Sequence, residues 1–217
     1  MAKCINMMTL KQGQDALLSG MTMNLTNIIL IIIGSITAGI GLLYNNFMVI
    51  IGSMLLSPIG NSIIRLSLGY NYLDRKMMIE GLTSMVAQFV LAFVFGYIMG
   101  MVNIENGEPM KMPTEEMEKR VKDRNYKIDY ILSLLMGFIL AYSLIYTQST
   151  ALVGLRLSLA VLPALVNGGL YISMAHYEND MKKYEEYMEN GKKMFRLVTV
   201  NLLGVLFTTI VGFHYFC

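Results

Sequence analysis

Six long apolar runs set the main constraint on how this chain of 217 residues folds. A helix needs about 20 mostly apolar residues to cross the roughly 30 Å hydrocarbon core of a bilayer. Because backbone polar groups find no water in hydrocarbon, such runs must satisfy their hydrogen bonds internally, as helices do. The sequence therefore predicts an all-α, multi-pass integral membrane protein with six transmembrane helices. The runs cover approximately residues 24–43, 46–68, 78–102, 128–147, 149–175 and 196–216.

The composition supports a membrane protein and argues against several other classes. Hydrophobic residues make up 55% of the chain and charged residues 15%, whereas soluble domains average about 25% charged residues. The net charge is only +2, without a long run of Lys and Arg, so we expect no nucleic-acid partner. Cys4 and Cys217 lie at opposite ends of the chain and form no metal-ligand pattern, so we expect no metal site and no cofactor. We also expect no cleavable signal peptide, because a mostly polar segment precedes the first run.

Two polar connections divide the chain. Residues 1–23 form a polar N-terminal segment, 24–102 a first unit of three spans, 103–127 a polar connection, and 128–217 a second unit of three spans. The second unit includes an amphipathic segment, 176–195, for which we expect a short helix that ends near Gly191. This helix either rests on the membrane surface or contacts another subunit. Residues 113–120 likewise predict a short, capped and exposed helix.

The second and fifth runs share an unusual interior. Each passes through a glycine to a proline in mid-segment, Pro58 or Pro163, and each carries an asparagine three or four residues later, Asn61 or Asn167. A proline inside a helix removes one hydrogen bond and clashes with the preceding turn. The pattern predicts that the second and fifth helices are both discontinuous.

The order of segments predicts an inverted repeat. Each half contains a tight hairpin, a proline-interrupted second helix, a polar connection and a third helix. Since three is odd, the second copy must enter the membrane upside down. Paired discontinuous helices in inverted repeats are typical of secondary transporters and line their solute path.

The two interrupted segments also resemble a known family. Residues 49–58, Val-Ile-Ile-Gly-Ser-Met-Leu-Leu-Ser-Pro, resemble the signature IGAMLISPL of the multipass membrane family called domain of unknown function 389. Residues 149–163 are similar to its second signature, SALVGVAIAVALLPP, if one residue is inserted after the serine. The resemblance covers about 24–216 and implies a membrane domain of about six helices, without an assigned activity.

The chain departs from the family pattern at a few positions. Ser62 and Ala164 stand where a second proline is usual, and Arg156 replaces a small apolar residue. We expect the large soluble N-terminal domain of bacterial relatives, and any regulation by it, to be missing here.

Candidate pathway residues lie around the two prolines. Ser57-Pro58 has the order of a helix cap followed by a proline in the first turn, which would direct the positive end of a half-helix toward the bilayer middle. The alternative is that the serines and asparagines only satisfy the backbone of kinked helices. The candidate residues are Ser53, Ser57, Pro58, Asn61, Ser62, Arg156, Ser158, Pro163 and Asn167.

Charged residues within or beside the spans add further candidates. Arg156 costs about 3 kcal/mol in hydrocarbon unless it snorkels, pairs or lines water, so it is either a snorkelling side chain or a pathway charge that favours anions. Glu80 and Asp129, at the starts of the third and fourth spans, are possible coupling sites. Arg65 is expected to anchor the end of the second span at the interface.

These features favour a channel or transporter that moves a small ion or polar solute, with an anion or neutral solute preferred. The alternative is a structural membrane protein that self-associates without transport. No nucleophile–base pair or phosphate-binding loop is visible, so we do not expect an enzyme. Besides the bilayer and the solute, we expect further copies of the chain as partners, because GxxxG-like motifs such as Gly96–Gly100 permit close helix contact, either inside the bundle or between subunits.

Overall fold

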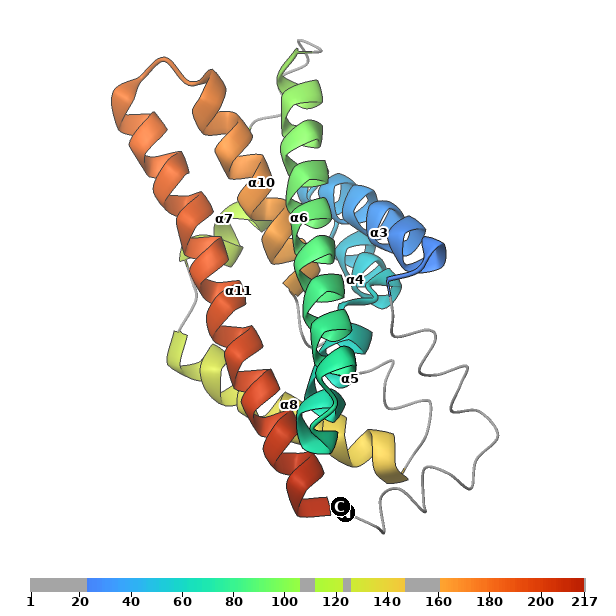
Figure 1. Ribbon diagram of the computed structural model, residues 1–217. Coiled ribbons are helices and arrows are strands. Elements are labelled where there is room, and N and C mark those ends of the chain that lie inside the picture. The colour runs from blue at the N-terminus through green and yellow to red at the C-terminus, as the bar shows by residue number, and fades with distance from the viewer. Residues whose placement is uncertain (1–22, 106–111, 123–125, 147–160, 217) are drawn as a thin grey trace.

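Helices, most of them apolar, make up nearly all of the described residues, as the sequence predicts. The computed structural model describes residues 23–105, 112–122, 126–146 and 161–216, and these residues contain helices but no strand. Figure 1 shows the helices as a bundle around two long members, α6 and α11. The helices are α3 (Leu25–Leu43), α4 (Phe47–Leu56), α5 (Ile59–Tyr72), α6 (Arg75–Glu105), α7 (Glu115–Lys122), α8 (Tyr126–Tyr146), α10 (Val161–Tyr177) and α11 (Met181–Phe216).

Four helical stretches in the described residues are long and apolar enough to cross a membrane. They are α3, α4 together with α5, most of α6, and α11. The expected spans 128–147 and 149–175 correspond to α8 and α10, which are not among these four, and residues 147–160 lie outside the described part of the chain. The six-span arrangement therefore stays a prediction at these two spans.

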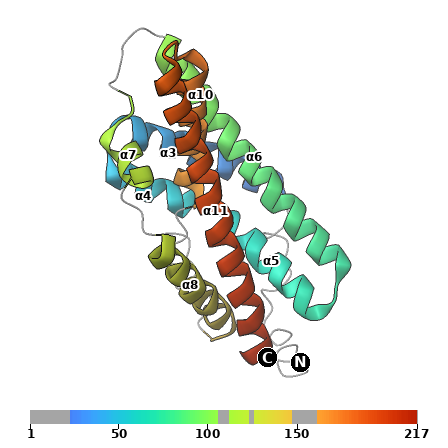
Figure 2. The ribbon, with the colours of Figure 1, turned by 90° about the vertical axis from the view of Figure 1, so that its left-hand side faces the viewer.

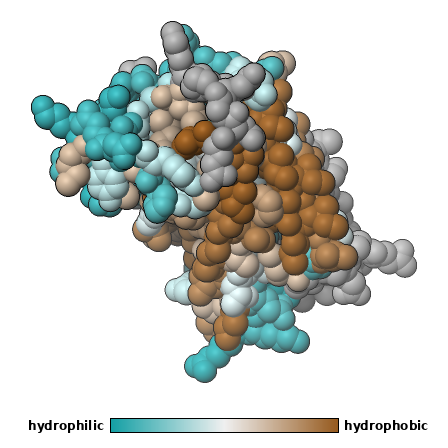
Figure 3. All heavy atoms as spheres, turned by 90° about the horizontal axis from the view of Figure 1, so that it is seen from above, coloured by the Kyte–Doolittle hydropathy of each residue, from teal (hydrophilic) through white to brown (hydrophobic). Residues whose placement is uncertain are grey.

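The surface of the bundle suits a lipid environment. One stripe of α6 exposes seven large apolar side chains at intervals of three or four residues, from Ile79 to Val102. Seen from above, Figure 3 shows such side chains covering one side of the molecule, with hydrophilic side chains gathered elsewhere on the same face. Soluble monomers rarely expose an apolar surface this continuous.

α5 and α10 each pack against both long helices, but at opposite ends. Leu66 of α5 lies against Gly81 in the first half of α6, and Asn71 of α5 donates a hydrogen bond to the carbonyl oxygen of Ile210, near the end of α11. Val166 of α10 lies against Gly96 in the second half of α6. α10 also crosses the first half of α11. Figures 1 and 2 show α5 beside the lower half of α6 and α10 beside its upper half.

The small-residue motifs serve contacts inside the chain. A Cβ atom on Gly96 would lie 2.4 Å from the carbonyl oxygen of Val166, and one on Gly137 would lie 2.3 Å from the carbonyl oxygen of Val205. Gly39 of α3 similarly faces Met99 and Val166. Of the two roles that the sequence leaves open for these motifs, the structure thus favours packing within the bundle.

Two polar segments differ from their predicted form. Gly191 does not end a short amphipathic helix, because α11 continues from Met181 to Phe216. Gly191 instead lies where α11 crosses α10, and a Cβ there would meet the Ile172 side chain at 2.8 Å. α7 is capped by Thr114, whose Oγ1 accepts from the backbone N–H of Met117 at 3.3 Å. It is not an exposed helix, since Met117 is fully buried.

Candidate functional site

The second apolar run contains a real interruption at Ser57-Pro58. α4 ends at Leu56, Ser57 is extended (φ −67°, ψ 122°), and α5 begins at Ile59. The sequence predicts Ser57 as the cap, but Pro58 occupies that position. Ser57 is extended, as residues before a proline usually are, and the helix begins one residue later than predicted because Pro58 itself has non-helical dihedral angles (φ −83°, ψ 2°). The Ser57 hydroxyl still accepts a long hydrogen bond of 3.5 Å from the Ile59 N–H.

The corresponding part of the fifth run is only partly described. Pro163 is the third residue of α10, which runs without interruption to Tyr177. Arg156 and Ser158 lie outside the described residues, so the predicted break before Pro163 stays a prediction.

The contacts along α6 show how α5 and α10 are placed. Along α5, Leu66 lies at Gly81 and Gly69 lies at Met78, so α5 runs toward the start of α6. Along α10, Val166 lies at Gly96 and Ser173 lies at Gly100, so α10 runs toward the end of α6. The two helices therefore diverge from the middle of α6. We call the region between Ile59, the first residue of α5, and Val161, the first described residue of α10, the half-helix junction.

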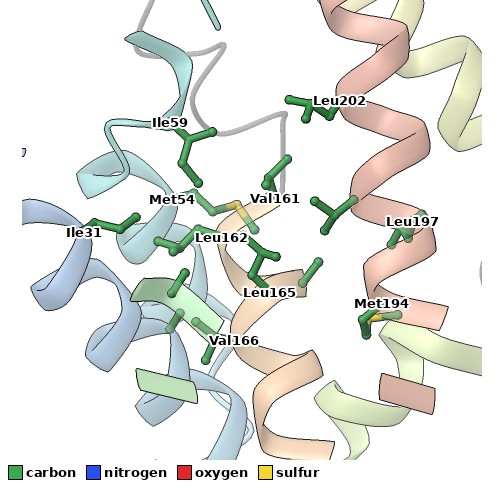
Figure 4. Close-up of a cluster of buried hydrophobic side chains, with 14 of the residues drawn as sticks. Ile31, Met54, Ile59, Val161, Leu162, Leu165, Val166, Met194, Leu197 and Leu202 are labelled. Carbon is green, nitrogen blue, oxygen red and sulfur yellow. The ribbon is translucent and has the colours of Figure 1, made fainter. Parts of the chain in front are cut away.

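Apolar side chains close the half-helix junction. Ile59, Val161 and Leu162 are each 2–4% exposed, and Figure 4 shows them in one cluster with Met54 of α4 and Leu202 of α11. These side chains are packed as in an ordinary hydrophobic core, in contact with one another and without water between them.

Two further polar side chains, on α6 and α5, are buried. Gln88 of α6 is fully buried, and neither its Nε2 nor its Oε1 has a hydrogen-bond partner among the described residues. The Ser62 hydroxyl of α5 is equally buried and also lacks a partner there. Ser62 is a candidate from the sequence, whereas Gln88 is not. The sequence feature that could have identified Gln88 is that it places an amide side chain in the middle of the apolar run 78–102.

Of the other candidate residues near Pro58, Ser53 bonds local backbone through its side chain. Ser53 is buried and donates to the carbonyl oxygen of Ile50 at 2.6 Å, within its own helix. Asn61 is half-buried in the first turn of α5, where its backbone N–H donates a hydrogen bond to the carbonyl oxygen of Pro58 at 3.0 Å. Ser53 thus fits the alternative in which polar residues satisfy a kinked helix.

Asn167 faces away from the half-helix junction. It is fully buried and donates to the carbonyl oxygen of Met117 at 3.2 Å and to the sulfur of Met194 at 3.7 Å. These partners belong to α7 and α11, so Asn167 holds the polar connection against the bundle. The structure does not bring Asn167 and Asn61 together as a matched pair.

The charged candidates form one buried pair. Arg65, only 9% exposed, makes a salt bridge with Glu80 across the contact between α5 and α6. Arg65 is therefore not an exposed interfacial anchor, and Glu80 carries a cationic partner. Asp129 lies half-buried in the first turn of α8. Among the described residues, no group of three or more His, Cys, Asp and Glu side chains is placed to hold a metal ion.

Comparison with known proteins places this architecture in a family. The chain is 22% identical over 186 residues to the uncharacterized protein MJ0678 of Methanocaldococcus jannaschii, a match that covers 86% of this chain and 54% of that protein. The chain thus spans about half the length of this curated relative. No solved structure matches it. The sequence model of the family described as "Domain of unknown function (DUF389)" matches residues 54–212, so the chain belongs to the DUF389 family.

Proposed function

We propose that this protein is a membrane channel or transporter that moves a small ion or polar solute, an anion or neutral solute preferred, through the half-helix junction. The observation that carries the proposal is the divergence of α5 and α10 from the middle of α6. The first N–H groups of a helix have no partner within it, and each helix N-terminus carries roughly half a positive charge. Secondary transporters place half-helix ends of this kind at their substrate sites.

We further propose that the chain forms six spans in two inverted units, 24–102 and 128–217. An inverted repeat would exchange α3 with α8, α5 with α10, and α6 with α11. Under this exchange the contact of α5 with α6 maps onto that of α10 with α11, and the contact of α10 with α6 maps onto that of α5 with α11. All four contacts are present, as are the corresponding contacts of α3 with α6 and of α8 with α11. These matched contacts support the repeat independently of the spacing of the prolines. The contact of α3 with α10 is the exception, since α8 and α5 share no comparable contact among the described residues.

In this proposal the structure represents a closed state. Ile59, Val161 and Leu162 fill the half-helix junction, so conduction requires these side chains to separate. The most direct way is a movement of α5 or α10 relative to α6. Such rocking of one repeat against the other is the usual basis of alternating access.

Flux into proteoliposomes tests the proposal. The panel contains chloride, nitrate, bicarbonate, potassium, urea and glycerol. We expect flux of at least one anion or neutral solute, reduced by Pro58→Ala, Asn61→Ala, Ser62→Ala and Arg156→Leu. Ser67→Ala is the matched control, because Ser67 is a fully buried serine on the same helix, farther from the half-helix junction. The pathway is refuted if wild-type protein conducts none of these solutes, or if all four variants conduct as wild type does.

Glu80 and Asp129 are the proposed coupling residues. If Glu80 releases and binds a proton during transport, its salt bridge with Arg65 must form and break in each cycle. Glu80→Gln should then abolish accumulation driven by a pH gradient while downhill flux persists, and Asp129→Asn gives the same comparison in the second unit. Unchanged accumulation in both variants removes these residues from the coupling mechanism.

The alternative, a structural protein that self-associates without transport, draws support from the apolar cluster at the half-helix junction. This alternative requires that the wild-type protein passes none of the panel solutes. Self-association is part of both proposals, and light scattering of the purified protein in detergent measures it directly.

A further inference from the structure

We propose that Lys192 and Arg196 of α11 bind the phosphate of an anionic phospholipid, at the level of the bundle where the polar helix α7 docks. The proposal goes beyond the proposed function and makes no use of the half-helix junction. It requires only that α11 crosses the membrane, and α11 is among the helical stretches that are long and apolar enough to do so.

One face of α11 changes from apolar to basic along the helix. Leu203, Phe207 and Val211 are exposed and follow one another at intervals of four residues. Arg196 lies seven residues before Leu203, and Lys192 lies four residues before Arg196; both are exposed. Residues four or seven apart share one face of a helix. The face that presents apolar side chains to the acyl chains of lipid therefore ends in two cations.

The hydrogen bonds of Asn167 give the level of these cations in the bundle. Asn167 Nδ2 donates to the carbonyl oxygen of Met117 in α7 and to the sulfur of Met194 in α11. Met194 stands between Lys192 and Arg196 in the sequence, so α7 and the two cations lie at one level, as Figures 1 and 2 show for α7 beside α11. α7 has three acidic residues in its first turn and three basic residues in its last. A helix this polar belongs among lipid headgroups rather than in hydrocarbon.

The two cations also differ from their neighbours in their ion pairing. Lys193 forms a salt bridge of 3.0 Å with Glu189, and Lys122 of α7 forms one of 3.0 Å with Glu118. Neither Lys192 nor Arg196 forms a salt bridge with any residue that the structure describes. Long cationic side chains next to hydrocarbon extend toward the headgroup region, where lipid phosphates supply the counter-ion.

α8 places a third cation beside the same part of α11. The two helices run parallel, and Ser133 of α8 lies at Gly204 of α11; Figure 2 shows α8 beside α11. Six residues earlier on each helix, this register brings Lys127 within one turn of the level of Arg196. Lys127 is exposed. Cations from two adjacent helices thus lie at one level, above the apolar side chains of both.

The chemistry of these groups selects the class of lipid. A guanidinium offers parallel N–H donors that match two phosphate oxygens, and a lysine adds a point charge. The acyl chains of the same lipid would cover Leu203 and Phe207. In phosphatidylcholine the choline cation balances the phosphate charge, whereas phosphatidylglycerol keeps a net negative charge. Each Lys or Arg near the surface strengthens the binding of anionic lipid about fivefold, so we expect phosphatidylglycerol to be preferred.

A tryptophan reporter measures which lipid lies on this face. The chain contains no tryptophan, so Leu203→Trp introduces a single fluorophore next to the two cations. The protein is reconstituted into phosphatidylcholine vesicles that contain either brominated phosphatidylglycerol or brominated phosphatidylcholine at equal mole fraction, because bromine quenches indole fluorescence on contact. We expect brominated phosphatidylglycerol to occupy this position at least about fivefold more readily. Val90→Trp, on the exposed stripe of α6, is the control position and should show no preference.

Substitution of the cations assigns the preference to them. In the Leu203→Trp background, Arg196→Gln and Lys192→Gln should each lower the preference severalfold and together abolish it. Lys182→Gln is the matched control, because Lys182 is exposed on the same helix, about three turns nearer its start, and should keep the preference. Excess inorganic phosphate should also leave it unchanged, because the free ion lacks acyl chains.

The outcomes decide between lipid, free phosphate and protein on this face. Equal quenching by the two lipids refutes the site, and so does a preference that survives the double variant. Loss of the preference in inorganic phosphate refutes the lipid as the ligand. Quenching by neither lipid at Leu203→Trp, with normal quenching at Val90→Trp, refutes it in favour of a contact with a second copy of the chain. Each outcome is independent of solute flux, so this site and the proposed function fail separately.

Discussion

At the scale of single residues, glycines distinguish close packing from open space. Gly96 faces the backbone of Val166, and a Cβ there would lie 2.4 Å from its carbonyl oxygen. Gly52, in the middle of α4, has no atom within 4 Å of an added Cβ. Both sit inside helices, so the intrinsic gain from a Gly→Ala change is similar at the two positions.

Gly96→Ala should therefore destabilise the protein and Gly52→Ala should not. Overpacking against a backbone atom costs about 2 kcal/mol, while an unobstructed alanine in a helix gains about 0.5 kcal/mol. The midpoint of thermal unfolding in detergent should fall for the first variant and stay or rise slightly for the second. Equal midpoints for the two variants would mean that α6 and α10 do not approach closely at Gly96. The oligomeric state of each variant, measured alongside, shows whether Gly96 serves a subunit contact instead.

The same scale explains which site residues the sequence could identify. Ser57 and Pro58 follow a local rule, since a proline interrupts a helix whatever surrounds it. Gln88 follows no local rule, because its significance depends on which helices lie opposite it. The structure supplies that information through Gly81 and Gly96, whose neighbours belong to two different half-helices.

At the scale of elements, α7 shows how a polar connection becomes part of the bundle. Thr114 Oγ1 donates to the carbonyl oxygen of Leu42 at 2.7 Å, and Asn45 Oδ1 accepts from the Glu116 N–H at 2.8 Å. Asn167 of α10 donates to the Met117 carbonyl from the other side. Three hydrogen bonds thus join α7 and its cap to the end of α3, to the turn between α3 and α4, and to α10.

This docking predicts a specific pattern of thiol accessibility. In a background with Cys4→Ser and Cys217→Ser, Met117→Cys should react slowly with a maleimide, because Met117 is fully buried. Glu115→Cys should react fast, because the Glu115 side chain is 77% exposed. Adding Asn167→Leu removes one of the three hydrogen bonds, worth about 1 kcal/mol, and should raise the Met117→Cys rate severalfold without changing the Glu115→Cys rate. Equal rates at the two positions in the parent background would show that α7 is not docked.

The sequence predicts the range of a helix well where its hydropathy alone determines that range. The ranges of α3 and α6 follow their apolar runs because a bilayer-length apolar helix has few alternatives. Residues 113–120 were expected to form an exposed helix, but Met117 and Val121 of α7 are buried. Gly191 was expected to end a helix, but its close contact with α10 gives this glycine a packing role. Tertiary contacts decided both cases.

At the scale of the whole molecule, the helix directions determine which loops share a side. α8 runs parallel to the second half of α11, since Ser133 lies at Gly204 and Ala141 lies at Gly212. That half of α11 also contacts the end of α5, through Asn71 and Ile210. The last turns of α5, α8 and α11 therefore point the same way, and α10 ends at the opposite side, beside the second half of α6.

This arrangement predicts the sidedness of three loops. In the same cysteine-free background, Asp74→Cys and Gln148→Cys should react with a membrane-impermeant thiol reagent from one side of the membrane, and Asn179→Cys from the other. Asp74 and Asn179 are exposed in turns at opposite ends of α6, and Gln148 follows α8 by two residues in the sequence. Sealed vesicles, labelled before and after permeabilisation, give the side for each position. Tyr215→Cys, 80% exposed near the end of α11, is the control and should match Asp74→Cys.

Gln148→Cys is the decisive position, because it depends on whether α8 crosses the membrane. If only the four helical stretches that meet the length and hydropathy requirements span the bilayer, Gln148 stays on the side of Asn179, since no crossing separates the two. If α8 and the fifth run also cross, Gln148 moves to the side of Asp74. Asp74 and Asn179 lie on opposite sides under both arrangements, so they fix the reference frame. Labelling of Gln148→Cys from the side of Asn179 would contradict the inverted repeat, and with it the placement of the half-helix junction at the bilayer middle.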